Sequence, residues 1–150
     1  MRIIGGDHGG RKFHPPAKIP ARPTTDVAKE GLFNTLQNSL DFEGLKTLDI
    51  FGGTGSISYE LASRGATDLT IVERDKKTVL FIKATIEQLH FDNFKVMPME
   101  VFKFLEQCRE QYDFIFACPP YALKEIDEIP VKIFERQLLN PAGVFVLEHT

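Results

Sequence analysis

The residues best suited to chemistry lie in a glycine-rich turn and at the end of the apolar run that follows it. The turn reads Gly52-Gly53-Thr54-Gly55 and comes directly after Leu48-Asp49-Ile50-Phe51. Eighteen residues beyond Gly55, a second apolar run ends on Glu73. Glycines let a backbone approach a ligand closely, and an acidic residue closing the next strand can accept hydrogen bonds from ribose hydroxyls. This spacing is typical of a site for a nucleoside-containing cofactor.

The glycine turn matches only part of the dinucleotide-binding fingerprint. Gly53 and Gly55 supply its first two glycines, but Ser58 stands where the third would be. A tight strand-to-helix turn would show the same glycines, so the turn alone assigns no ligand. Asp49 and Glu73, in register with the turn, favour cofactor binding. Glu100, after the next strand, is placed to meet an adenine edge, although helix starts also favour acidic residues.

A second group of candidate residues is the segment Cys118-Pro119-Pro120-Tyr121, which follows a strongly apolar run. Consecutive prolines stiffen the backbone and remove donors, which leaves carbonyl oxygens to point into a pocket. Tyr121 offers an aromatic face on which a flipped-out base can stack. A proline-terminated strand with a core tyrosine would look the same, but the position at a strand end favours a functional role.

The elements that must position these residues alternate along the chain. The hydrophobic pattern predicts strands at 45–51, 69–73, 94–97, 112–117 and 143–147, and helices at 27–40, 56–64, 76–89, 100–108 and 126–139. Strands separated by helices imply right-handed crossovers and a doubly wound, mostly parallel α/β sheet. In such sheets ligands lie at the carboxyl ends of the strands, at the topological switch point. The glycine turn, Glu73 and the Cys118–Tyr121 segment all fall at those ends.

Composition indicates an ordinary globular protein. The chain has 150 residues, of which 43% are hydrophobic and 26% are charged, enough for one domain with a real core. Two cysteines without a Cys-x-x-Cys pair, and four histidines without ligand spacing, predict neither a disulfide framework nor a metal site. No signal peptide or membrane-spanning run is visible. We therefore expect a cytoplasmic monomer without membrane contact.

Charge is unevenly distributed along the chain. Residues 1–25 carry five Lys or Arg against Asp7, a net charge of +4, so the remaining residues carry −7 within a total of −3. A basic arm on an acidic body favours a localised contact with an anion such as nucleic acid, although a solvated tail would have the same composition. We expect residues 1–25 to form a basic arm and residues 26–150 to form the main domain.

Together these segments resemble one known family. The glycine turn with Glu73 looks like motif I of the S-adenosylmethionine (SAM) methyltransferases. The whole chain resembles RsmD-like methyltransferases, which methylate the exocyclic N2 of a guanine in small-subunit (16S) ribosomal RNA. The segments that carry this likeness are Met1–Gly6, Gly10–Lys12, Arg22–Asp26, Glu30–Leu36, Leu48–Ser56, Leu61–Ala66, Val72–Asp75 and Asp113–Tyr121.

The resemblance implies a class I, Rossmann-like fold, SAM as cofactor, and ribosomal RNA or an assembling small subunit as partner. The residues implied to bind the cofactor are Asp49, Phe51, Gly52, Gly53, Gly55, Glu73, Arg74 and Glu100, with Asp49 orienting the loop or the methionine ammonium. The residues implied to be catalytic are Cys118, Pro119, Pro120 and Tyr121. The residues implied to bind RNA are Arg2, Arg11, Lys12, Arg22 and Thr24. The mechanism would be mainly positioning for a direct displacement at the methyl carbon.

The chain departs from the family pattern at Cys118, where Asp or Asn is usual. A thiol is a poor acceptor for an amine hydrogen. Three interpretations follow: activity based on backbone carbonyl acceptors, which we favour, a different target atom, or lost activity. Thr85 replaces a usual Asn, with a structural effect expected. The chain also stops soon after the strand at 143–147, whereas this class usually adds two more strands, so we expect a C-terminally truncated domain.

Three alternatives belong to other functional classes. An exocyclic-amine (N6-adenine) DNA methyltransferase would share the order of the motifs. A catalytically impaired, RNA-binding ribosome-assembly factor would fit Cys118. An NAD-dependent oxidoreductase is disfavoured by Ser58 and by the Pro-Pro-Tyr segment.

Overall fold

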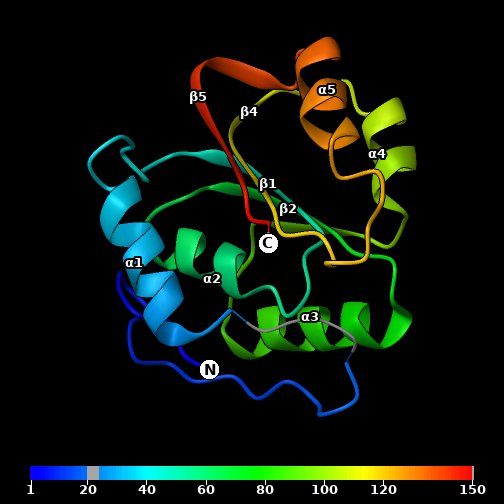
Figure 1. Ribbon diagram of the computed structural model, residues 1–150. Helices are drawn as coiled ribbons and strands as arrows, with labels where there is room; N and C mark the ends of the chain where they lie inside the picture. Colours follow the sequence, from blue (N-terminus) through cyan, green and yellow to red (C-terminus); the bar gives the residue numbers. More distant parts are fainter. Residues whose placement is uncertain (20–23, 150) are drawn as a thin grey trace.

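A parallel sheet of five strands, flanked by helices on both faces, makes up the fold (Figure 1). The computed structural model describes residues 1–19 and 24–149. The strands are β1 (Lys46–Ile50), β2 (Asp68–Val72), β3 (Phe94–Met97), β4 (Tyr112–Ala117) and β5 (Leu139–Leu147). The helices are α1 (Asp26–Leu36), α2 (Ser56–Ser63), α3 (Lys76–Gln88), α4 (Val101–Gln107) and α5 (Glu128–Glu135). The predicted doubly wound α/β fold is confirmed.

The strand order is β3-β2-β1-β4-β5, so the direction of winding reverses between β1 and β4. Successive residues of each strand face opposite sides of the sheet. In β4, Phe114 and Phe116 pack with α1 and α2, whereas Ile115 and Ala117 pack with α4 and α5. Both faces of the sheet are therefore buried, which explains the near-continuous apolar runs of the strands.

Most element boundaries agree with the sequence pattern to within two residues, and the exceptions have local causes. Thr25 caps α1 by accepting a hydrogen bond from the Ala28 N–H (3.1 Å). That helix ends at Leu36 rather than at residue 40, because the chain turns there.

The predicted helix at 126–139 is too long at both ends. α5 begins at Glu128, with Pro130 in its first turn, where a missing N–H costs nothing, and ends at Glu135. Gln137 then adopts a positive φ of 54°, which a helix cannot continue. Leu139, assigned from its apolar character to the helix, instead begins β5, whose register with β4 shifts between Tyr112 and Phe114.

Residues 1–13 form a folded N-terminal hairpin rather than a solvated tail. Arg2 and Lys12 form an antiparallel bridge, and the Ile3 N–H donates to the Arg11 carbonyl (2.9 Å). Ile3 and Phe13 are buried against Tyr59 of α2. Within residues 1–13, strand pairing is limited to this one bridge.

Within residues 1–19 and 24–149, the helices are all too short or too polar to cross a membrane.

Removing a buried side chain of the hairpin tests whether it is docked in solution. The Phe13 ring lies edge-to-face on Tyr59, with ring centroids 5.2 Å apart. We expect Phe13→Ala to lower the free energy of unfolding by about 3–5 kcal/mol in urea titrations, because it empties a packed site. His14→Ala, at an exposed neighbour, should change it by less than about 0.5 kcal/mol. Equal, small effects of both variants would mean that the hairpin is undocked.

Candidate active site

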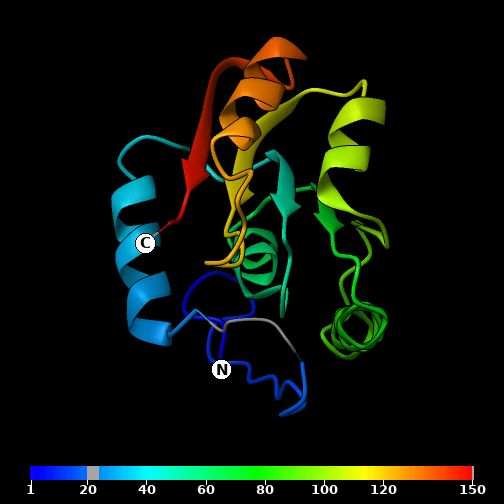
Figure 2. The ribbon, with the colours of Figure 1, turned by 45° about the vertical axis from the view of Figure 1, so that its right-hand side comes forward.

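A large cleft opens at the carboxyl ends of the strands, with a volume of about 1420 Å³. That volume exceeds the roughly 300–1,000 Å³ of a typical small-ligand pocket, which leaves room for a cofactor and part of a second substrate. The glycine turn after β1, the end of β2, the start of α3 and the Cys118–Tyr121 segment all line it. Figure 2 shows β1 and β4 ending beside each other above the N-terminal hairpin.

The glycine turn has a conformation that larger residues could not adopt. Gly55 has a φ of 83°, and a Cβ there would lie 2.4 Å from the Tyr59 hydroxyl. A Cβ on Gly52 would lie 2.2 Å from the Ile71 Cγ2 atom. Phe51 also has a positive φ, of 62°, a strained conformation that occurs most often at ligand sites. The fold itself thus requires these glycines, and they expose the backbone of the turn to the cleft.

Glu73 is brought to the glycine turn, as its spacing predicted. Its Oε1 accepts a hydrogen bond from the Gly53 N–H (3.0 Å), and its Oε2 accepts one from the Asp75 N–H (2.9 Å). An ionised carboxylate has about four acceptor positions, so two such bonds leave capacity for two ligand hydroxyls. Glu73 therefore both fixes the turn and is able to bind a diol.

Asp49 lies at the bottom of the cleft and is 2% exposed. Burial raises the pKa of its carboxyl group to about 8, the negative charge of Glu73 adds to this, and a hydrogen bond from the Ser58 hydroxyl (2.9 Å) opposes it. A cationic ligand group nearby would favour the ionised form. Ser58, the residue that breaks the dinucleotide fingerprint, thus has a role here as the donor to Asp49.

Glu100 lines the cleft as the N-cap of α4. Its carboxylate accepts a hydrogen bond from the Phe102 N–H. The cap alone explains an acidic residue at this position, so contact with an adenine edge stays a prediction. The sequence pattern missed Met99 and Phe102, which add apolar surface beside Glu100. Arg74, predicted to bind cofactor, also lines the cleft.

The Cys118–Tyr121 segment faces the glycine turn across the switch point. Cys118 is half-buried, Pro119 is buried, and Tyr121 is 64% exposed. The Pro120 carbonyl accepts a hydrogen bond from the Leu123 N–H (3.0 Å), which fixes a turn after the prolines. No disulfide joins Cys108 to Cys118. Tyr121 lies at the cleft, and stacking of a base on its ring stays a prediction.

The residues predicted to bind RNA divide between the hairpin and the cleft. Arg11 and Lys12 are exposed on the hairpin, and Arg2 forms an ion pair with Asp26 (3.5 Å). Thr24 lines the cleft, whereas Arg22 lies outside the described residues. Four other basic residues line the cleft but were not predicted from the sequence, where their positive charge is the only signal. They are Lys18, Lys76, Lys77 and Lys132.

Two buried charged residues also went unnoticed in the sequence. Lys29 and Glu60 are each 0% exposed and form an ion pair between α1 and α2 (3.5 Å). The signal was present at Lys29, which shares helical spacing with the buried Phe33 and Leu36.

Across residues 1–19 and 24–149, no three His, Cys, Asp or Glu side chains gather in a way that could hold a metal ion.

A family model described as Conserved hypothetical protein 95 matches residues 1–150. The chain belongs to that family. It is 31% identical over 153 residues to the putative rRNA methyltransferase YlbH of Bacillus subtilis, covering 99% of this chain and 82% of the relative. It is 32% identical over 128 residues to ribosomal RNA small subunit methyltransferase D of Escherichia coli K12, covering 85% of this chain but only 64% of the relative.

Solved structures of methyltransferases share the fold of this chain. A putative methyltransferase from Escherichia coli superposes with a TM-score of 0.88 at 29% identity, covering 99% of this chain and 81% of that one. A putative methyltransferase complexed with SAH matches with a TM-score of 0.71 at 24% identity, covering 83% and 36%, and shows the fold alone. The expected resemblance to RsmD-like methyltransferases and the class I methyltransferase fold are confirmed.

The buried carboxyl group of Asp49 predicts a pH-dependent stability. Its pKa is about 8 in the folded chain against an ordinary 3.8, so the folded chain binds the proton more tightly. The free energy of unfolding should therefore fall as pH rises through that interval, by at most about 1.4 kcal/mol per pH unit. Asp49→Asn keeps an acceptor for Ser58 but cannot titrate. Urea titrations should show the variant gaining stability relative to the parent between pH 5 and 8. Parallel curves would contradict the assignment.

Proposed function

We propose that this chain transfers a methyl group from SAM to the exocyclic N2 of a guanine in small-subunit (16S) ribosomal RNA. The observation that carries this proposal is the meeting of the glycine turn, Glu73 and the Cys118–Tyr121 segment at one cleft. A nucleoside-binding carboxylate beside a stacking aromatic ring suits a cofactor and a base held face to face. The names of the relatives support ribosomal RNA as the class of substrate.

The cofactor would lie along the glycine turn. Glu73 accepts the ribose hydroxyls, and the Gly52–Gly55 backbone permits close approach of the ligand. Asp49, at the bottom of the cleft, pairs with the methionine ammonium. Glu100 and Arg74 flank the adenosine, with the apolar Phe51 as a packing surface. When bound, SAM supplies an electrophilic methyl group that needs no metal.

The acceptor base would be held by the Cys118–Tyr121 segment. A base that is stacked and paired in a duplex cannot enter the cleft, so the base must leave its stack, and the exposed Tyr121 ring receives its face. The backbone carbonyls of Cys118 and Pro119 accept the amine hydrogens, because the thiol at position 118 is a weak acceptor. This contact holds the nitrogen lone pair in line with the methyl carbon, so the rate enhancement comes from positioning.

RNA would approach over the basic arm, residues 1–25, toward the main domain, residues 26–150. Arg11 and Lys12 are exposed on the hairpin, and Thr24 borders the cleft. Arg2 and Arg22 complete the proposed phosphate contacts. Binding should weaken steeply with salt, since each neutralised phosphate releases counterions. Both naked ribosomal RNA and an assembling small subunit carry such a backbone.

Methyl transfer tests the proposal directly. Labelled SAM should modify unmethylated small-subunit RNA, naked or within assembling particles, and the label should map to a guanine N2. DNA of matched length should remain unlabelled. Label on adenine N6 of DNA would favour the rival methyltransferase. If the parent transfers no methyl group and Cys118→Asp does, the natural chain has lost catalysis at position 118. That result would favour the RNA-binding assembly factor.

Glu73 provides the sharpest test of the cofactor site. We expect Glu73→Ala to raise the Kd for SAM at least about 10-fold, because two ribose hydroxyls lose a charged acceptor. Glu87→Ala, an exposed carboxylate on α3, should leave the Kd unchanged. Calorimetry at one pH measures both. Identical Kd values for the two variants would remove Glu73 from the site.

A further inference from the structure

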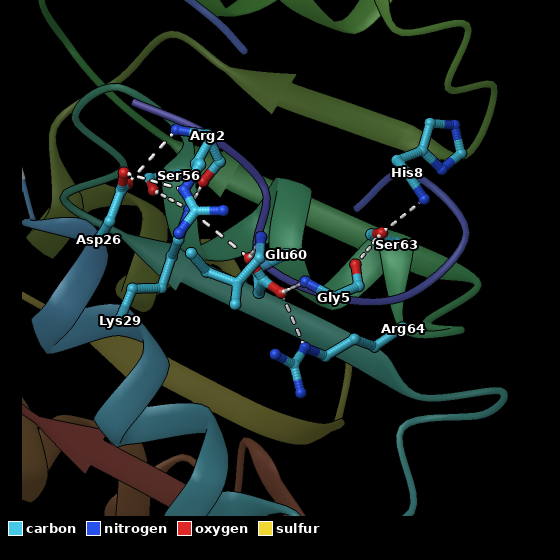
Figure 3. Close-up of polar contacts among 10 residues, drawn as sticks. Arg2, Gly5, His8, Asp26, Lys29, Ser56, Glu60, Ser63 and Arg64 are labelled. Atoms are coloured by element: carbon cyan, nitrogen blue, oxygen red, sulfur yellow. Dashed lines mark hydrogen bonds and ion pairs between the residues drawn. The ribbon is translucent and has the colours of Figure 1, made fainter. Parts of the chain in front are cut away.

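One buried ammonium group joins three parts of the molecule. The Lys29 Nζ atom donates to the Arg2 carbonyl in the N-terminal hairpin (2.6 Å) and to the Ser56 hydroxyl in α2 (3.0 Å). It also lies 3.5 Å from the Glu60 Oε1 atom. Figure 3 shows Lys29 reaching from α1 into the space between the hairpin and α2. Its position is therefore set by all three elements at once.

Glu60 completes the connection to the hairpin. Its carboxylate accepts hydrogen bonds from the Ile4 N–H (2.8 Å) and the Gly5 N–H (2.9 Å), and from the Arg64 Nε atom (2.8 Å) (Figure 3). Burial opposes ionisation of Glu60, but these bonds outweigh it and lower the pKa of its carboxyl group. The hairpin is thus attached to α2 by charge-assisted hydrogen bonds.

A buried ion pair is a poor source of net stability. Removing two charges from water costs free energy that their attraction only partly offsets, and apolar residues of similar size are often as stable. Burial lowers the pKa of Lys29, although Glu60 and Asp26 act against that change. The ion pair instead fixes the positions of α1, α2 and the hairpin relative to one another. It does so because the buried Glu60 oxygens and the Lys29 ammonium group each need hydrogen-bond partners on the neighbouring elements.

The geometry bears on the cofactor site through Ser56. Ser56 is the first residue of α2, directly follows Gly55, and lines the cleft. The same ammonium therefore touches the hairpin, which carries Arg11 and Lys12, and the residue that ends the glycine turn. Lys29 thus gives a direct path of contacts from the hairpin to Ser56.

We propose that Lys29 is a positioning residue that couples the N-terminal hairpin to the glycine turn, so that RNA binding and SAM binding strengthen each other. This inference rests on the proposed function. Coupling between two sites is reciprocal: if RNA on the hairpin tightens SAM binding, SAM tightens RNA binding by the same factor. A coupling of about 5-fold is at the low end of the usual range.

The experiment measures the Kd for SAM with and without protein-free small-subunit RNA made in vitro, using the whole chain. In the parent, RNA should lower the Kd about 5-fold. Lys29→Met keeps an unbranched side chain as far as Cε but loses all three polar contacts of the ammonium group, and should lose this effect. Arg64→Met is the matched control, because Arg64 also pairs with Glu60 yet has no contact with Ser56. It should keep the effect even if its Tm falls.

A second variant separates positioning from stability. Lys29→Met leaves Glu60 buried without its lysine, so it could unfold. Ser56→Ala keeps the Lys29–Glu60 ion pair and the hydrogen bonds from the hairpin to Glu60, so it should fold, while the contact between Lys29 and Ser56 is lost. We expect no RNA effect on the Kd in this variant. Retained coupling in it, or loss of coupling in Arg64→Met, would overturn the role of Lys29. A parent that binds both ligands without coupling overturns this inference alone, whereas a parent that binds no SAM overturns the proposed function and this inference with it.

Discussion

The register of the parallel sheet is the constraint on which the candidate site depends. Ile50 of β1 pairs with Val72 of β2 on one side and with Ala117 of β4 on the other. The residue that follows each strand is therefore Phe51, Glu73 or Cys118, so the glycine turn, Glu73 and the proline segment begin at one level. The crossovers that follow β1 and β4 run in opposite directions, so they leave a crevice open at the carboxyl ends of these two strands. A slip of one residue would turn these side chains to the wrong face.

Much of this arrangement could be predicted because it is local or periodic. Buried parallel strands appear as apolar runs, and the position of Glu73 follows from strand length alone. The failures occur where distant contacts decide the outcome. Residues 1–13 are rich in glycine and lack periodicity, and their fold depends on Glu60, more than fifty residues away. Leu139 satisfies a helical and a strand pattern equally well, and only the positive φ of Gln137 separates them.

Contacts between distant elements also explain two buried polar residues whose roles the sequence spacing did not indicate. Ser58 counts as a defect in a dinucleotide fingerprint, but it is the donor that satisfies the buried carboxyl group of Asp49. Lys29 lies on the buried face of α1 with Phe33 and Leu36, where a charged residue is unexpected from the sequence pattern. In both cases a buried polar side chain is explained by its partner, and the partner lies on another element. Such pairs become visible only once the elements are placed in space.

Binding of SAH, followed by amide NMR of the whole chain, tests the central claim most directly, because it reports where the ligand sits without requiring turnover. We predict large shifts for the amides of Gly52, Gly53, Glu73 and Phe102, with smaller ones reaching the hairpin through Ser56. The amide signals of residues around Gln111 and Asn140, near the amino ends of β4 and β5, should not shift. Saturable shifts at the amino ends of these strands, or none at the glycine turn, would contradict a cofactor site at the switch point.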